Sequence, residues 1–94
     1  MRAVVLLPGV LREHAAGRDR LEVDLPDDAR VGAVLELVSE EWPVLGRRLR
    51  DDTGAIRKHV NVFVDGEDVR RTGGLTTPVP DGAVVHVLPS VAGG

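Results

Sequence analysis

One segment of this 94-residue sequence, residues 31–42, has the periodicity of an amphipathic helix, whereas the other long apolar runs have the length of strands. Its apolar residues share one helix face through the i, i+3, i+4, i+7 spacing of Val31, Val34, Leu35 and Val38. We expect Pro43 to end this helix, because the residue before a proline disfavours the α region. Asp27 and Asp28 are expected at the helix N-terminus, where negative charge is favourable. A short further helical turn is predicted over residues 45–49.

The strand-length runs are rich in valine and alternate with period two, which is typical of β-structure. Four strands are predicted, over residues 3–7, 21–25, 60–64 and 84–88, and residues 67–71 add a short edge strand. The first two form an opening hairpin around a turn region at residues 9–17. Asp65-Gly66 predicts a tight turn after the third strand. Residues 50–59 are polar and are expected to form a loop.

The order of these segments predicts an α+β fold in which one main helix packs across one face of a mixed sheet. This is the β-grasp arrangement of ubiquitin. The length allows one domain, residues 1–94, and no second one. Pro89 is expected to stop the last strand, so that residues 90–94 form a flexible tail beyond the folded body.

Alternation along the strands also predicts the side chains of the opposite sheet face, which the helix cannot cover. That face is expected to carry Val4, Leu6, Phe63, His86 and Leu88. A contiguous apolar patch of this kind usually marks a surface that binds a partner. Two alternatives remain open: these side chains are scattered, or the loop at 50–59 covers them.

Composition excludes several classes of protein. Cysteine is absent, which excludes disulfides, iron–sulfur clusters, thiolate zinc sites and cysteine nucleophiles. A net charge of −3 and only two aromatic residues argue against a nucleic-acid or anionic-membrane surface. The first apolar run stops at Pro8 and is too short for a secretory signal, so we expect a cytoplasmic protein.

No pattern in the sequence predicts catalysis. The three histidines (His14, His59 and His86) are too scattered to predict a metal site. The adjacent carboxylates and the Arg47-Arg48 and Arg70-Arg71 pairs are interpreted as solvated surface. We therefore expect that this chain is not an enzyme and binds no cofactor itself.

The sequence ends in Gly93-Gly94. A terminal carboxylate is a poor acyl donor and must be activated, typically by adenylation, in an enzyme site that excludes water. A slender tail is needed to reach such a site, and glycine has no Cβ to obstruct it. The alternative is a frayed end, which also favours small residues.

Three segments together resemble the ubiquitin-like sulfur-carrier family: VNVFVDGEDVR at 60–70, Gly-Gly-Leu at 73–75, and the closing DGAVVHVLPSVAGG at 81–94. That family includes the carrier of the thiamine pathway, the small subunit of molybdopterin synthase and the carrier that serves a cysteine synthase. The ending Leu-Pro-x-Val-Ala-Gly-Gly is most similar to the cysteine-synthase branch. Two positions depart from the family pattern: Arg30 replaces a common threonine, which weakens the helix cap, and Ala83 replaces a frequent aspartate.

The resemblance implies that an E1-like enzyme adenylates Gly94 with ATP and converts it to a thiocarboxylate. Gly93, Ala92 and Val91 would enter partner active sites, and the uncovered sheet face would be the docking face. It further implies a pyridoxal-phosphate cysteine synthase as sulfur acceptor and a zinc metalloprotease that releases cysteine, so ATP, pyridoxal phosphate and zinc would belong to partners. Alternatives are a carrier for molybdopterin or thiamine synthesis, a protein modifier conjugated through Gly94, and a pure interaction domain.

Overall fold

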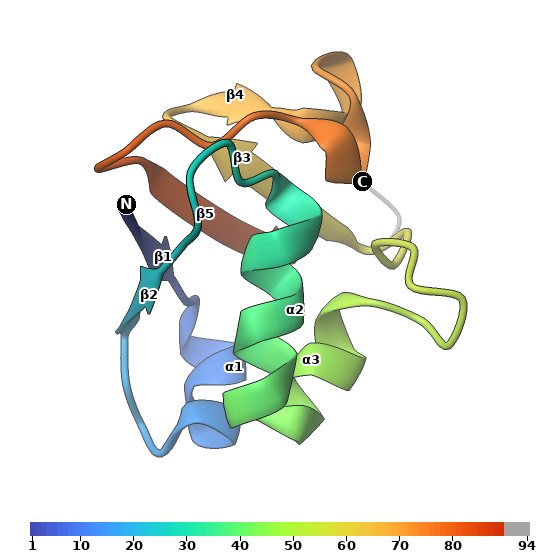
Figure 1. Cartoon of the computed structure of the whole chain (residues 1–94). Helices are drawn as coiled ribbons and strands as arrows, with labels where there is room; N and C mark the ends of the chain where they lie inside the picture. Colours follow the sequence, from blue (N-terminus) through green and yellow to red (C-terminus); the bar gives the residue numbers. More distant parts are fainter. Residues whose placement is uncertain (90–94) are drawn as a thin grey trace.

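Five strands form one mixed sheet in the order β2-β1-β5-β3-β4, and helix α2 lies across one of its faces (Figure 1). This computed structural model describes residues 1–89. Along the chain the elements are β1 (Arg2–Leu6), α1 (Gly9–Arg12), the 3₁₀ turn η1 (Glu13–Ala15), β2 (Arg20–Asp24), α2 (Val31–Glu41), α3 (Pro43–Leu49), β3 (Val60–Val64), β4 (Glu67–Asp68), the 3₁₀ turns η2 (Val69–Arg71) and η3 (Gly74–Thr76), and β5 (Val84–Pro89). The predicted α+β, ubiquitin-like architecture is confirmed.

Strand pairing brings distant parts of the chain together. β1 and β2 form the predicted antiparallel hairpin, and β3 and β4 form a second one. β5 pairs with β1 in parallel and with β3 in antiparallel orientation, so the strand that follows Ala83 joins the two hairpins. The β3–β4 turn has positive φ angles at Asp65 (49°) and Gly66 (88°), as the primed turns of tight hairpins require.

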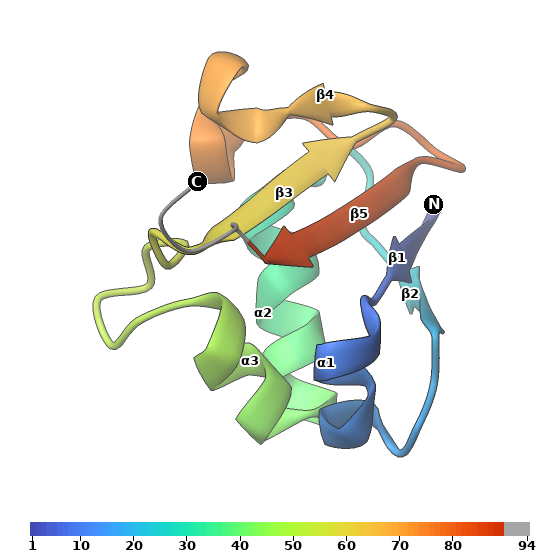
Figure 2. The ribbon, with the colours of Figure 1, turned by 180° about the vertical axis from the view of Figure 1, so that it is seen from behind.

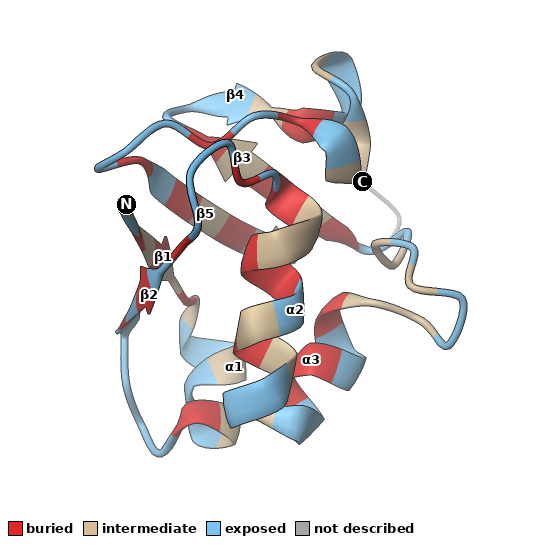
Figure 3. Ribbon diagram, in the orientation of Figure 1, coloured by how far each residue is buried: buried red, intermediate tan, exposed pale blue. Residues whose placement is uncertain are grey.

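The hydrophobic core fills the space between the sheet and α2, as the alternation predicts (Figure 3). Along β3, Val60, Val62 and Val64 are buried, whereas Asn61 and Phe63 between them are only half-buried. The helix contributes its predicted apolar stripe, which is buried throughout: Val31, Val34, Leu35 and Val38. Burial of these side chains is the main favourable term in the folding of such a domain.

Helix α1 is the first departure from the sequence-based expectation. Residues 9–17 were expected to form only a turn region, but Gly9–Arg12 is helical and Glu13–Ala15 continues as a 3₁₀ turn. Ala15 is fully buried, and the Arg12 Nε donates a hydrogen bond to the Leu7 carbonyl at 3.1 Å. A four-residue helix is too short to show a periodicity, so tertiary contacts define it.

The segment before α2, which itself starts at Val31 as predicted, is the second departure. The prediction for Asp27 and Asp28 is wrong: they precede the helix, and Asp28 has a positive φ of 62°. The chain turns at residues 27 and 28 and is extended at the N-cap, Arg30, where neighbouring backbone groups pair with residues 77–79 at 2.9 and 3.0 Å. Arg30 makes no side-chain cap, as expected from the missing threonine.

Pro43 ends α2 as predicted and occupies the first turn of α3. The two helices pack closely where Gly46 of α3 faces Ser39 of α2. A Cβ at position 46 would lie 2.6 Å from the Ser39 Cβ and 2.8 Å from its Cα, distances that real side chains do not adopt. The absence of a side chain at Gly46 therefore sets how near α3 approaches α2.

Candidate functional site

The sheet face opposite α2 carries all five residues predicted for it. Val4 and Leu6 project from β1, Phe63 from β3, and His86 and Leu88 from β5, and each is half-buried. Their inward-facing neighbours on the same strands are buried, which confirms the alternation on which the prediction depended. We call this surface the outer face.

The strand register shows how these side chains are arranged. His86 is the register partner of Leu6 on one side and of Phe63 on the other, so the three form a row across β1, β5 and β3. Val84 is paired with Val4, and Leu88 with Asn61. The outer face is therefore a contiguous surface in which apolar side chains lie around the one histidine of β5.

Val84 and Asn61 complete the outer face, although the sequence analysis did not include them in the docking set. Val84 is 39% exposed, which is high for a strand valine. Alternation alone assigned both to the correct side of the sheet. Their contact with the other outer-face residues depends on the register of β5 against β1 and β3, which the sequence alone does not give.

The loop at 50–59 does not cover the outer face. Ile56 packs against the hydrophobic core, and with Ala55 it lines an apolar cavity of about 260 Å³ that also includes the inward-facing Val60 and Val62. Figure 2 views the sheet from the side opposite α2, where no element of residues 1–89 crosses β3 or β5. The described part of the chain thus leaves this apolar surface open to a partner.

Charged side chains border the outer face along the β2 edge. The Arg2 Nε donates to the Asp24 carboxylate at 3.0 Å, and an Arg2 Nη lies 3.8 Å from Glu22. The hydrogen bond to Asp24, and then the charges of Asp24 and Glu22, raise the pKa of Arg2 above its ordinary value. An apolar centre with a polar rim is the usual organisation of a protein–protein interface.

Arg70 borders the opposite side, and sequence reasoning missed it. Its guanidinium donates to the Val60 carbonyl at 2.8 Å, to the Lys58 carbonyl at 3.2 Å and to the Asn61 side chain. Arg70 was interpreted as solvated surface, but it ties η2 to the first residues of β3. No sequence pattern could reveal this, because its partners lie nine to twelve positions away.

The predicted tail residues Gly94, Gly93, Ala92 and Val91 lie outside the described residues. The structure does place the strand that precedes them. Pro89 is paired with Val60, and Leu88 lies beside Asn61 on the outer face. Position 90 therefore follows directly after the end of the sheet that carries Leu88.

Residues 1–89 contain neither a metal-binding cluster of side chains nor a helix that could span a membrane. No three histidine, aspartate or glutamate side chains of this range gather closely enough to hold a metal ion. The helices of this range are all too short or too polar to span a bilayer.

Comparison with known proteins agrees with the observed fold. A family model described as the ThiS family matches residues 5–94. The sulfur carrier protein CysO of Mycobacterium tuberculosis is 38% identical over 96 residues, covering 100% of both chains. Small archaeal modifier protein 3 of Haloferax volcanii is 44% identical over 81 residues, covering 86% of this chain and 87% of the relative.

The structural comparison gives the same result. A chain in the crystal structure of the Amycolatopsis orientalis BexX/CysO complex superposes with a TM-score of 0.86 at 34% identity, covering 98% of this chain and 99% of that one. The resemblance inferred from the three sequence segments is thereby confirmed over the full length. The chain belongs to the ThiS family of ubiquitin-like sulfur carriers, and it is a carrier protein rather than an enzyme.

Proposed function

We propose that the carboxylate of Gly94 is adenylated and then converted to a thiocarboxylate, which donates its sulfur in cysteine biosynthesis. The observation that carries the proposal is the full-length similarity to the sulfur carrier CysO. The outer face supports it, because an open apolar surface ends beside the position from which residue 90 continues.

The chemistry needs two steps at one carbon atom. The Gly94 carboxylate attacks the α-phosphate of ATP, pyrophosphate leaves, and an acyl adenylate forms. A sulfur nucleophile supplied by the activating system then attacks the acyl carbon, AMP leaves with the bonding electrons, and a thiocarboxylate remains. Neither step requires an acid, a base or a metal from this chain, which contributes the acyl group and the surface that positions it.

The outer face serves this function as the docking surface for the E1-like enzyme. Val4, Leu6, Phe63, His86 and Leu88 form one contiguous patch. Binding through such a patch would hold the carrier body while Val91, Ala92 and Gly93 extend into the active site. Phe63 is the one large aromatic side chain of the patch and is the expected centre of the binding energy.

The acceptor is the second partner. We propose a pyridoxal-phosphate cysteine synthase, in which the thiocarboxylate sulfur bonds to the β-carbon of an activated serine and the activating group leaves, giving a thioester. The cysteine amino group would then take the Gly94 acyl group from sulfur, which leaves as the thiol, and a zinc metalloprotease would hydrolyse the resulting Gly94–cysteine amide with water and regenerate the carboxylate. ATP, pyridoxal phosphate and zinc belong to these partners, and we place the cycle in the cytoplasm. Molybdopterin and thiamine synthesis are the alternative acceptor pathways.

Intact-mass measurement of the protein from its own host tests the proposal. The expected result is a mass gain equal to one oxygen replaced by sulfur, localised to Gly94 by fragmentation. The purified carrier should also gain this mass when incubated with ATP, a sulfide source and the host's E1-like enzyme. An unmodified mass under both conditions would overturn the carrier function.

A second candidate function is conjugation to other proteins through Gly94. The similarity to small archaeal modifier protein 3 favours it, because that relative's name describes a modifier. Both functions begin with an activated Gly94 and differ in the product that it forms. The same mass experiment therefore separates them. Conjugates in which Gly94 is joined to a lysine of another protein, without thiocarboxylate, would assign the modifier function.

A further inference from the structure

β2 lies at one edge of the sheet, so part of its backbone faces away from every other strand of residues 1–89. The pairing with β1 fixes which residues these are. The Leu7 N–H donates to the Asp19 carbonyl at 2.9 Å, and the Leu25 N–H donates to the Met1 carbonyl at 2.7 Å. The backbone N–H and C=O groups of the odd-numbered residues of β2 therefore point toward β1. The backbone groups of the even-numbered residues face the open edge.

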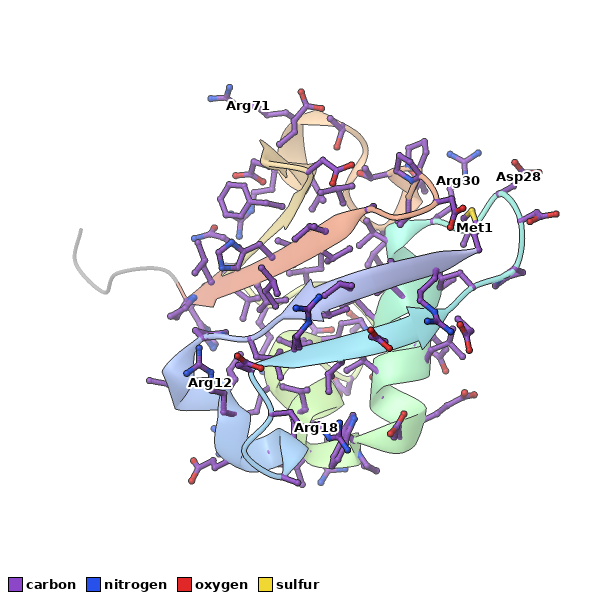
Figure 4. The ribbon with its side chains drawn as sticks, turned by 90° about the vertical axis from the view of Figure 1, so that its left-hand side faces the viewer. Met1, Arg12, Arg18, Asp28, Arg30 and Arg71 are labelled. Atoms are coloured by element: carbon purple, nitrogen blue, oxygen red, sulfur yellow. The ribbon has the colours of Figure 1, made fainter. Side chains whose placement is uncertain are left out.

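A groove runs between this edge and helix α2. It has a volume of about 410 Å³ and is lined by Leu21–Asp24 on the strand side. Leu37 and Trp42, both half-buried, supply apolar surface on the helix side. A second hollow, which shares Leu21, Glu22 and Glu41 with it, continues it toward Arg18 and Arg20. Figure 4 shows the molecule from this side, with β2 in the foreground and α2 behind it.

The groove is acidic for most of its length, because Glu22, Asp24, Glu40 and Glu41 line it and no basic side chain lines its larger part. Arg2 neutralises Glu22 and Asp24 in part, from the outer face. Among residues 1–89, no ion pair reaches the other two glutamates. Both lie in the last turn of α2, where the helix dipole disfavours negative charge. Their position is thus unfavourable for the helix and favourable for a cationic ligand.

We propose that this edge groove binds an extended, lysine- or arginine-bearing segment of a partner protein, which pairs with β2 as a sixth strand. The outward N–H and C=O groups of Arg20, Glu22 and Asp24 would supply the backbone hydrogen bonds. Side chains of the added strand alternate, so those that point toward α2 meet Leu37 and Trp42. Basic side chains that point the other way meet the carboxylates of Glu22 and Asp24, and a basic side chain at the end of the segment meets Glu40 and Glu41.

This groove lies at the opposite edge of the sheet from β4 and does not include the outer-face residues. The proposal does not depend on the chemistry of Gly94. A partner held at β2 would leave the apolar residues of the outer face on β3 and β5 available. The carrier could then remain attached to one protein while it exchanges sulfur with another.

NMR titration of the ¹⁵N-labelled full chain tests the proposal directly. The probe is a capped peptide of alternating lysine and valine, and the matched control is the same peptide with glutamate in place of lysine. The lysine peptide is expected to shift the amides of Arg20, Glu22 and Asp24 and the Trp42 indole, and to slow hydrogen exchange at Glu22. Equal shifts with both peptides, no shifts, or shifts confined to the outer face would overturn the proposal.

Two variants separate the backbone from the charge contribution. Glu22→Pro removes an N–H that faces the open edge and leaves the bonds to β1 intact, so it should abolish binding in a folded protein. Glu22→Gln keeps that N–H and should retain most of the affinity. Folding of each variant is checked by circular dichroism and thermal unfolding.

The double variant Glu40→Lys with Glu41→Lys provides the test if Glu22→Pro does not fold. It should weaken the lysine peptide by about tenfold and admit the glutamate peptide. Unchanged affinity would overturn the proposal. Sedimentation equilibrium tests whether a second copy of this chain occupies the edge instead. A dimer of the unmodified chain that Glu22→Pro dissociates would assign the β2 edge to self-association and overturn the proposal.

Discussion

His86 and Phe63 are register partners across β5 and β3, and both side chains lie on the sheet face that α2 leaves uncovered. This pairing places an aromatic ring beside the one titratable side chain at the centre of an apolar surface. Binding energy at interfaces is concentrated in a few such central residues. The pair therefore identifies where substitutions should affect partner binding most.

Phe63→Ala is expected to lower kcat/KM for adenylation by the E1-like enzyme by about tenfold or more, because it removes the largest apolar side chain of the outer face. The measurement is pyrophosphate release at varied carrier concentration. Val44→Ala is the matched control, since Val44 is 42% exposed but lies on α3. Equal effects of the two substitutions would contradict the docking role of the outer face.

Deletion of Gly93 and Gly94 is expected to abolish thiocarboxylate formation and leave the fold intact. The hydrophobic core is formed by residues up to Val87, so the melting temperature should stay the same within error. Thermal unfolding and intact mass are measured on the same sample. A cellular function that survives the deletion would leave a pure interaction domain as the better interpretation.

Gly46→Ala should reduce the free energy of unfolding by about 1–3 kcal/mol, because the added Cβ overlaps Ser39 and forces α3 away from α2. Gly32→Ala is the matched control in α2. Its Cβ would meet the Leu75 carbonyl oxygen at 3.4 Å, and the higher helix propensity of alanine offsets that contact. Chemical denaturation compares the two variants, and equal losses would contradict the close approach of the helices.

Arg70→Ala should destabilise the protein by about 1–2 kcal/mol, because it leaves the carbonyls of Lys58 and Val60 without their charged donor. Arg70→Lys should recover only part of this loss, since an ammonium group cannot reproduce the planar fork of the guanidinium. Arg71→Ala is the neighbouring control and is expected to change the stability by less than about 0.5 kcal/mol. If Arg71→Ala costs as much as Arg70→Ala, the contacts of Arg70 are not the cause.

Asp51 should show a stability contribution that depends on pH. The hydroxyl of Thr53 donates to its carboxylate at 2.5 Å, and this hydrogen bond is the main cause that lowers the pKa of Asp51 below its ordinary value. A lowered pKa stabilises the folded state above about pH 3.9, the unfolded value, and this stabilisation disappears as the pH falls through the folded value.

Thr53→Ala is therefore expected to raise the pKa of Asp51 in an NMR titration of its carboxyl carbon. The stability difference between the unmodified protein and this variant should shrink as the pH falls and vanish once Asp51 is protonated in both. A difference that stays constant from pH 7 to about pH 2 would show that the hydroxyl acts independently of the charge.

The parts of the structure that depend on local patterns were predictable from the sequence. Period-two alternation identified the outer face through Phe63 and His86, and the 3.6-residue period identified α2. The prediction failed where contacts between distant segments determine the local structure. The pairing of residues 29–31 with 77–79 keeps Asp27 and Asp28 outside the first turn of α2, and the three acceptors of Arg70 come together only in the folded sheet. The open edge of β2 likewise requires knowledge of the strand order.

The parallel pairing of β1 with β5 also has a consequence for synthesis on the ribosome. Val4 of β1 pairs with Val84 of β5 (Val84–Pro89), so the sheet cannot close until β5 has been made. The outer face needs His86 and Leu88 from that same last strand. A chain that lacks β5 therefore presents no complete outer face.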